Sequence, residues 1–158
     1  MGTLIGAAVE ERILEREHEG IRAGLSTLQG AIEDAHRLTR VEIAERVARI
    51  TSWMHRDFLP HAAWEEAWLY SRLDQESGSP WTTRGLRFQH EQIRELASAL
   101  ESASVVAHDR WTREIEFDLV AAMARLDALF TAHLAQEELF VVPLLDERGA
   151  RHDRQPGG

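Results

Sequence analysis

Two copies of one short pattern contain the residues of this chain that are best suited to chemistry. His61-Ala-Ala-Trp-Glu65 recurs as His133-Leu-Ala-Gln-Glu137, and a second glutamate follows each copy directly. On a helix, a spacing of four residues places both side chains on one face, about 6 Å apart. Imidazole nitrogens and carboxylate oxygens are common metal ligands. The repeated pattern therefore predicts a metal centre inside a helical bundle.

The composition limits the classes of protein and partner that we expect. The chain has 158 residues, of which 44% are hydrophobic and 28% charged, which suits one domain with its own core. A formal net charge of −9 without a local basic patch excludes nucleic acid as an expected partner. No apolar run reaches about 18 residues and no signal-peptide pattern is visible, so we expect a soluble, cytoplasmic protein with no membrane span.

The absence of cysteine limits the ligands that a metal can have. Without cysteine there are no disulfides and no thiolate metal sites, so a metal must be held by histidine and carboxylate. Ala, Leu, Glu and Arg dominate while Pro is scarce, which predicts an all-α protein. Amphipathic stripes with steps of three and four residues predict four helices. Short turns between them predict an up-down-up-down antiparallel four-helix bundle over residues 1–149, followed by a flexible C-terminal tail at 150–158.

Local signals predict where these helices begin and end. The first helix is expected over about 7–38, and Thr39-Arg-Val-Glu42 is a capping box that opens the second. Pro60 lies inside the second helix and predicts a kink just before the histidine that follows it. Ser77-Gly78-Ser79-Pro80 predicts a stop after about residue 75, with Pro80 at the first position of the third helix.

Two further histidines lie on apolar stripes, His18 on the first helix and His90 on the third. In an antiparallel hairpin, residues that are equally distant from the turn lie side by side. His18 and His61 are equally distant from the turn that the capping box predicts. His90 and His133 meet only if the turn between the third and fourth helices lies at residues 109–112, which we therefore predict.

The two glutamates complete the candidate site. Glu65 and Glu137 lie on the same stripes as the histidines, and no Lys or Arg shares those stripes. A buried, ionised carboxylate without a partner costs several kcal/mol, so a cation is expected beside them. Four histidines and two carboxylates are too many ligands for one tetrahedral zinc ion, and they suit two cations that the carboxylates bridge. Ligands without sulfur suit iron, manganese or zinc.

The spacing of these six residues resembles that of the hemerythrin-like family, also called the HHE cation-binding domain, over roughly residues 14–145. The resemblance is carried by His18, His61-x-x-x-Glu65, His90 and His133-x-x-x-Glu137. It implies a non-haem, carboxylate-bridged pair of iron ions, with manganese or zinc as possible substitutes. The four histidines would be terminal ligands and the two glutamates bridges. An open coordination position would bind O₂ or another small diatomic or peroxide ligand.

Two features differ from the oxygen carriers that this family includes, a longer His-to-Asp spacing on their fourth helix, where this chain has His133-x-x-x-Glu137, and a residue of the third helix. Those proteins have a His-x-x-x-His pair on the third helix, whereas Arg94 follows His90 here. Fewer nitrogen donors favour a response to O₂, NO or peroxide, or iron handling, over reversible O₂ carriage. Two alternatives stay open, a di-iron oxidoreductase that decomposes peroxide or NO and a non-catalytic iron or redox sensor. The sequence does not identify a protein partner.

Several residues near the motif have roles that the sequence leaves open. Glu66 and Glu138 rotate about 100° away from the ligands, so each is either a surface charge or an outer partner of a ligand imidazole. Arg94 is either a surface residue or a partner of acids near the site, and His55 is expected off the stripe.

Three aromatic residues after the two motifs also have expected positions. Trp68 is expected on the apolar stripe beside the site, where it would exclude water, and Phe140 on the corresponding stripe of the fourth helix. Tyr70 is expected on the helix face opposite His61, which would keep it away from the site.

Overall fold

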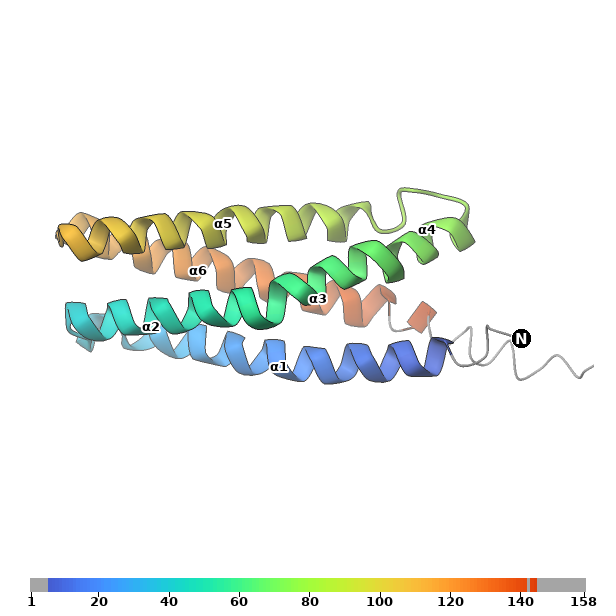
Figure 1. Cartoon of the computed structure of the whole chain (residues 1–158), viewed down its shortest axis with the longest axis horizontal. Helices are drawn as coiled ribbons and strands as arrows, with labels where there is room; N and C mark the ends of the chain where they lie inside the picture. Colours follow the sequence, from blue (N-terminus) through green and yellow to red (C-terminus); the bar gives the residue numbers. More distant parts are fainter. Residues whose placement is uncertain (1–5, 142, 145–158) are drawn as a thin grey trace, which may run out of the picture.

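Four long helical segments lie side by side along the length of the molecule (Figure 1). The computed structural model describes residues 6–141 and 143–144, with side chains from residue 16 onward. Within these residues all regular structure is helical, which confirms the predicted all-α class. None of the helices described is long and apolar enough to span a membrane. The expected tail at 150–158 lies outside the described residues.

The segments are built from long α-helices and short turns of other helix types. The first and second segments contain α1 (Gly6–Asp34), the 3₁₀ turn η1 (Ala35–Arg37), α2 (Arg40–Trp53), the π-helical turn η2 (Met54–Phe58), α3 (Leu59–Trp64), the π-helical turn η3 (Glu65–Leu69) and α4 (Tyr70–Ser77). The third and fourth contain α5 (Arg84–Asp109), α6 (Arg113–Gln136) and the π-helical turn η4 (Glu137–Val141). Contacts between α1 and α2, α2 and α5, α5 and α6, and α6 and α1 close the four segments into a ring.

Threonine caps begin α2 and α6. The Thr39 hydroxyl accepts the backbone N–H of Glu42 at 3.4 Å, and the Glu42 carboxylate accepts the backbone N–H of Thr39 at 2.8 Å, which confirms the predicted capping box. Thr112 caps α6 in a simpler way, because its hydroxyl accepts one backbone N–H at 3.2 Å. Since α5 ends at Asp109, the predicted turn at 109–112 is confirmed.

The turn between α4 and α5 differs in part from the prediction. Gly78 ends α4 in the left-handed conformation, with φ of 67°, which glycine adopts without strain. However, α5 begins at Arg84, so Pro80 lies in the turn and not at the first helical position. The cause is Asp74, whose carboxylate accepts the backbone N–H of Thr83 at 3.1 Å and its hydroxyl at 2.9 Å. These bonds hold the chain in a longer turn.

The second segment changes direction between α2 and α3 (Figure 1). The π-helical turn η2 ends at Phe58, two residues before Pro60, which is the second residue of α3. Proline has no N–H to continue the α-helical ladder, and a wider turn relieves this conflict. The kink predicted before His61 is therefore present, in the form of a π-helical turn.

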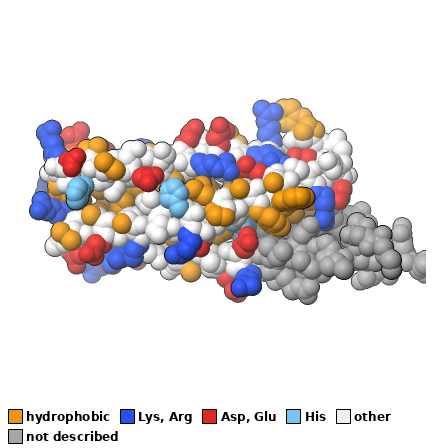
Figure 2. Space-filling model, in the orientation of Figure 1, with side chains coloured by type: hydrophobic (Ala, Val, Ile, Leu, Met, Phe, Trp, Pro, Cys, Tyr) orange, Lys and Arg blue, Asp and Glu red, His pale blue; other side chains and the backbone are white. Residues whose placement is uncertain are grey.

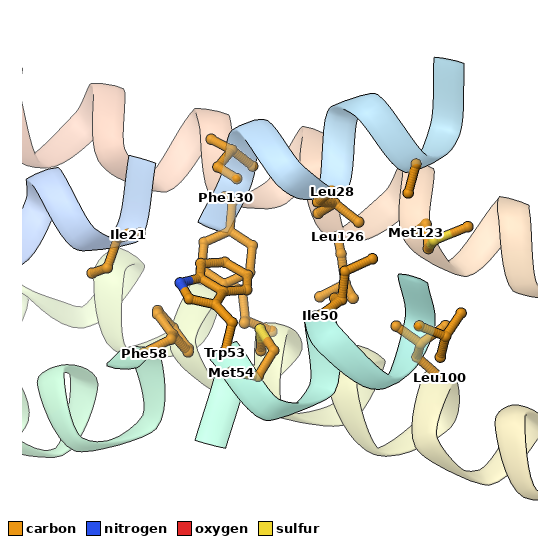
Figure 3. Close-up of a cluster of buried hydrophobic side chains, with 14 of the residues drawn as sticks. Ile21, Leu28, Ile50, Trp53, Met54, Phe58, Leu100, Met123, Leu126 and Phe130 are labelled. Atoms are coloured by element: carbon orange, nitrogen blue, oxygen red, sulfur yellow. The ribbon is translucent and has the colours of Figure 1, made fainter. Parts of the chain in front are cut away.

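The main hydrophobic core is built around aromatic rings and draws on all four segments (Figure 3). Ring centroids of Phe58 and Phe130 lie 4.6 Å apart, and those of Trp53 and Phe130 lie 5.1 Å apart. Helix α1 approaches Trp53 so closely that a Cβ atom at Gly24 would lie 1.9 Å from the indole. A smaller cluster, which includes Tyr70, packs beyond the candidate ligands, and His90 contacts both Phe58 and Tyr70.

Candidate metal centre

The six predicted ligands are all buried and come together in the structure. Each is between 0% and 3% exposed. They form two overlapping groups of four, and in each group one ligand atom per residue lies within 4.8 Å of the others. The first group is His18, His61, Glu65 and Glu137, and the second is Glu65, His90, His133 and Glu137. The two glutamates are therefore common to both groups, as carboxylates that bridge two ions must be.

The first group contains polar atoms that the protein leaves without hydrogen bonds. His18 Nε2 lies 3.1 Å from Glu137 Oε2, and His61 Nε2 lies 3.0 Å from Glu65 Oε1. Among the described residues, none of these four buried atoms has a hydrogen-bond partner of acceptable geometry. Such atoms are costly to bury and usually find partners in native proteins. Four of them so close together fit the donor set of a cation.

The second group places two imidazole nitrogens face to face. His90 Nε2 and His133 Nε2 lie 3.0 Å apart, and they lie 3.3 Å and 3.5 Å from oxygens of Glu65 and Glu137 respectively. Two such nitrogens satisfy one another only if one of them has the proton. A cation bound to both would use the lone pair of each. The donor set of this group therefore fits a metal ion as well.

Three of the four histidines are oriented from outside by an oxygen acceptor. The pairs are His61 Nδ1 with Glu17 Oε2 at 2.6 Å, His90 Nδ1 with Glu66 Oε1 at 2.8 Å, and His133 Nδ1 with Gln89 Oε1 at 3.2 Å. Because these oxygens accept, Nδ1 is the protonated nitrogen and donates to them. The lone pair of Nε2 then faces the other ligands, as it does in a metal-binding imidazole.

Arg94 extends the contact between Glu66 and His90. Its Nη2 donates to Glu66 Oε1 at 2.6 Å, so Arg94 lies beside the outer partner of His90 and not among the ligands. Burial raises the pKa of Glu66, but the hydrogen bonds from Arg94 and His90 outweigh it and lower this pKa below its ordinary value. The sequence left two roles open for each of these residues. In the structure Glu66 is an outer partner of a candidate ligand imidazole, and Arg94 is a partner of an acid near the site.

The other two residues with open roles lie on the surface. Glu138 forms an ion pair with Arg22 of α1, and about half of each side chain is exposed. His55 Nε2 lies 3.7 Å from Glu101 Oε2, and both of these side chains are more than half exposed. Neither Glu138 nor His55 therefore supports a ligand imidazole in the structure.

Tyr70 lies in the site, and the prediction that it faces away from His61 is wrong. Its hydroxyl donates to Glu137 Oε1 and lies 3.4 Å from Glu65 Oε2. Its ring stacks on that of His90, with centroids 5.5 Å apart. The prediction assumed an unbroken α-helix from His61 onward. The turn η3 contains an extra residue, which rotates Tyr70 by about 100° and brings it to the ligand face.

A π-helical turn with an extra residue follows both copies of the repeated motif. The turns η3 and η4 each begin at the glutamate of a His-x-x-x-Glu pair. Trp68 is 70% exposed and Phe140 58% exposed, whereas Leu69 and Val141 are buried in their place. The expectations that Trp68 covers the site and that Phe140 continues the apolar stripe are therefore wrong, for the same geometric reason.

Burial and close carboxylates shift the pKa values of the central groups. Among the protein groups alone, burial raises the pKa of Glu65 well above its ordinary value, and the nearby Glu137 adds to this. Burial also raises the pKa of Glu137, but the nearby imidazoles of His18 and His133 and the hydroxyl of Tyr70 lower it to about 2. Burial lowers the pKa of His133 to about 4, so its imidazole is neutral near pH 7. Burial and both carboxylates raise the pKa of Tyr70, which therefore keeps its proton.

Three neighbours of the ligands were missed by the sequence reasoning, Tyr70, Glu17 and Gln89. Nothing in the helical periodicity indicates Tyr70. The other two follow a simple rule, because each directly precedes a candidate histidine and bonds the histidine across the same hairpin. Glu17 reaches His61 and Gln89 reaches His133. An acceptor side chain just before the first histidine of each hairpin, His18 and His90, was the available signal.

Comparison with protein families identifies the chain. Residues 10–145 match the model of the hemerythrin HHE cation binding domain, and this match covers most of the chain. The protein therefore belongs to the hemerythrin HHE family, and it contains a buried histidine–glutamate cluster that is able to hold metal. No curated protein and no solved structure matches it significantly.

Proposed function

We propose that this protein is a non-haem di-iron protein that binds O₂ or a related small molecule. In this proposal His18 and His61 would hold one iron ion, His90 and His133 would hold the other, and Glu65 and Glu137 would serve both. The observation that supports it most is the set of four buried ligand atoms without hydrogen-bond partners among the described residues. The ring of contacts between the segments and the alternating ends of their turns also support an up-down-up-down topology for the bundle (Figure 1).

Iron is the proposed metal because of the donor atoms and their number. Imidazole and carboxylate without sulfur suit iron, and manganese or zinc are possible substitutes. Two bound iron ions would supply electron exchange with O₂, NO or peroxide. The residues around them have separate tasks: Glu17, Glu66 and Gln89 fix the imidazole orientations, while Phe58 packs edge-on against His90 and keeps water from that side.

The surroundings of His90 support a response to small molecules, or iron handling, over reversible O₂ carriage. The position of the fifth histidine expected in a carrier is occupied by Arg94, which points to Glu66. The candidate ligand set therefore has four nitrogen donors. The ion that His90 and His133 would hold would then have fewer protein ligands than in a carrier, and more room for a small molecule.

A second candidate function, the decomposition of peroxide or NO, is favoured by Tyr70. Its hydroxyl lies against both bridging glutamates and keeps its proton. Reduction of peroxide to water consumes protons, and the Tyr70 hydroxyl would hold one at the carboxylates of Glu65 and Glu137. The catalytic alternative predicts turnover of hydrogen peroxide that is lost when His61 and His133 are both replaced by alanine.

Iron quantification together with an O₂-dependent near-UV and visible spectrum tests the leading proposal. We expect about two iron ions per chain and an absorption band that appears on exposure to O₂. The His61→Ala/His133→Ala variant should lose both, whereas His55→Ala, a surface histidine, should keep them. Protein that binds no iron, and that a chelator neither destabilises nor unfolds, would contradict the proposal. Loss of helicity on chelation without turnover would favour the sensor alternative.

A further inference from the structure

A pocket of about 400 Å³ lies between the second segment and α5, beside the candidate centre and not within it. Met54, Leu59, Ala97 and Leu100 form its apolar lining. Figure 2 shows apolar side chains gathered along the middle of the face that α2, α3 and α5 present, with acidic and basic side chains on either side. This volume is within the range of pockets that bury small organic ligands.

Arg94 belongs both to this pocket and to the contacts that orient His90. It lines the pocket, and it donates from Nη2 to Glu66, which accepts from His90 Nδ1. A guanidinium has five N–H donors. Among the described residues, Arg94 makes only the hydrogen bond to Glu66, and its side chain is 38% exposed. It therefore has donors left for an anion in the pocket.

Arg94 is the charged residue of the pocket lining that determines which charge a ligand must have. His55 and Glu101 also line it, but His55 Nε2 lies 3.7 Å from Glu101 Oε2 and both side chains are more than half exposed, so solvent screens the Glu101 carboxylate. A carboxylate pairs well with a guanidinium because two oxygens match two N–H groups. A hydrocarbon chain matches the apolar lining.

We propose that this pocket binds a small amphiphilic carboxylic acid, with its carboxylate on Arg94 and its hydrocarbon chain on Met54, Leu59, Ala97 and Leu100. The bound carboxylate shares the guanidinium with Glu66 and so loosens the outer support of His90. Removal of such an outer partner typically costs roughly 10–100-fold in metal affinity. The ligand therefore weakens metal binding by a smaller factor, and by linkage the metal weakens ligand binding by the same factor. The coupling rests on the proposed function, whereas the binding does not.

Calorimetric titration of the full chain with octanoate tests the binding, with octanol as the neutral probe of equal chain length. We expect one octanoate site, with an affinity about tenfold higher than that for octanol. Ala97→Phe fills the pocket and retains the Arg94 side chain, so it should weaken octanoate binding about tenfold or more. Ser102→Ala, an exposed position one turn further along α5 and outside the pocket lining, should leave it unchanged. Arg94→Gln should abolish the preference for octanoate over octanol.

Several results would contradict the proposal that this pocket binds a carboxylic acid. These are no octanoate binding, equal binding to the wild type and to Ala97→Phe, or a preference for octanoate that persists in Arg94→Gln. If Ala97→Phe does not fold, Ser98→Phe blocks the pocket from its exposed rim and gives the same comparison.

Competition for Zn²⁺ with a chromophoric chelator tests the coupling, because Zn²⁺ has no redox chemistry. Octanoate should lower the Zn²⁺ affinity of the wild type and leave that of Ala97→Phe unchanged. Unchanged Zn²⁺ affinity in a wild type that binds octanoate would overturn the coupling. A protein that binds no metal would contradict the proposed function, while the calorimetric result would still decide whether the pocket binds its ligand.

Discussion

The two helical hairpins provide matching halves of the candidate centre, but the protein surrounds these halves differently. His18 and His61 come from the first hairpin, and their Nε2 atoms have no hydrogen-bond partner among the described residues. His90 and His133 come from the second, where their Nε2 atoms face one another. Tyr70 reaches the shared carboxylates and stacks on His90, so it also belongs to the second half.

The outer partners differ in the same way. Glu17, which holds His61, is 42% exposed and makes no further hydrogen bond among the described residues. Glu66, which holds His90, is 28% exposed and is itself held by Arg94. The second half is therefore oriented by a chain of protein contacts, whereas the first depends more on the metal itself. Two candidate groups with the same residue types are therefore held by different protein contacts.

The largest expected difference between the halves concerns these outer partners. Glu66→Ala should lower the metal affinity of its half roughly 10–100-fold, because the orientation of His90 is lost. Glu17→Ala should lower metal affinity less, because the Glu17 carboxylate is exposed and water can replace it as the acceptor for His61. Chelator competition with Zn²⁺ measures both, and Glu101→Ala serves as a surface control. A larger effect of Glu17→Ala would reverse the comparison.

Tyr70→Phe tests whether the hydroxyl stabilises the protein before metal binds. The substitution removes a hydrogen bond to a charged carboxylate and keeps the ring that stacks on His90. We expect the free energy of unfolding of the metal-free protein to fall by about 1.5–3 kcal/mol. Urea denaturation with a chelator present measures it. An unchanged midpoint would show that this bond contributes nothing to stability.

Two glycines of α1 test how closely the first hairpin must pack. A Cβ atom at Gly24 would collide with Trp53, whereas one at Gly20 meets nothing within 4 Å. Gly24→Ala should destabilise the protein by about 1–3 kcal/mol, because α1 must move away from α2. It should also lower the metal affinity of the half of the centre that contains His18. Gly20→Ala is the matched control and should stabilise by about 0.5–1 kcal/mol through helix propensity. Equal unfolding midpoints for both variants would refute the close contact.

The smallest expected difference lies in the caps of the two hairpin turns. Thr112→Ala should cost about 1 kcal/mol, because one hydrogen bond to a backbone N–H is lost. Thr39→Ala should cost somewhat more, because it also breaks the reciprocal capping box with Glu42. Thermal unfolding of the two variants under equal conditions compares them. A larger loss for Thr112→Ala would be inconsistent with these contacts.

The sequence was sufficient to predict the all-helical class and the residues that converge. Histidines such as His18 and His90 were recognisable because they replace apolar residues on periodic stripes. The turn at 109–112 followed from requiring that His90 and His133 meet, and the structure has it there. These features depend on the helical period and on antiparallel pairing, which a sequence records directly.

The features that were missed depend on departures from that period. Tyr70, Trp68 and Phe140 were placed wrongly because a π-helical turn begins at each glutamate of the repeated pair. An extra residue in a turn is a response to tertiary packing, and no local residue pattern marks it. Likewise, Asp74 and Thr83 lengthen the turn before α5 through side-chain hydrogen bonds that turn statistics do not contain.

In the proposed function, both halves form one centre that would bind two cations through Glu65 and Glu137. Anaerobic titration of the metal-free protein with Fe²⁺, followed by metal analysis, tests it most directly. We expect two equivalents for the wild type, about one for His18→Ala or for His90→Ala, and almost none for Glu65→Ala, because Glu65 serves both ions. A wild type that binds no iron, or a Glu65→Ala variant that still binds two ions, would contradict the claim.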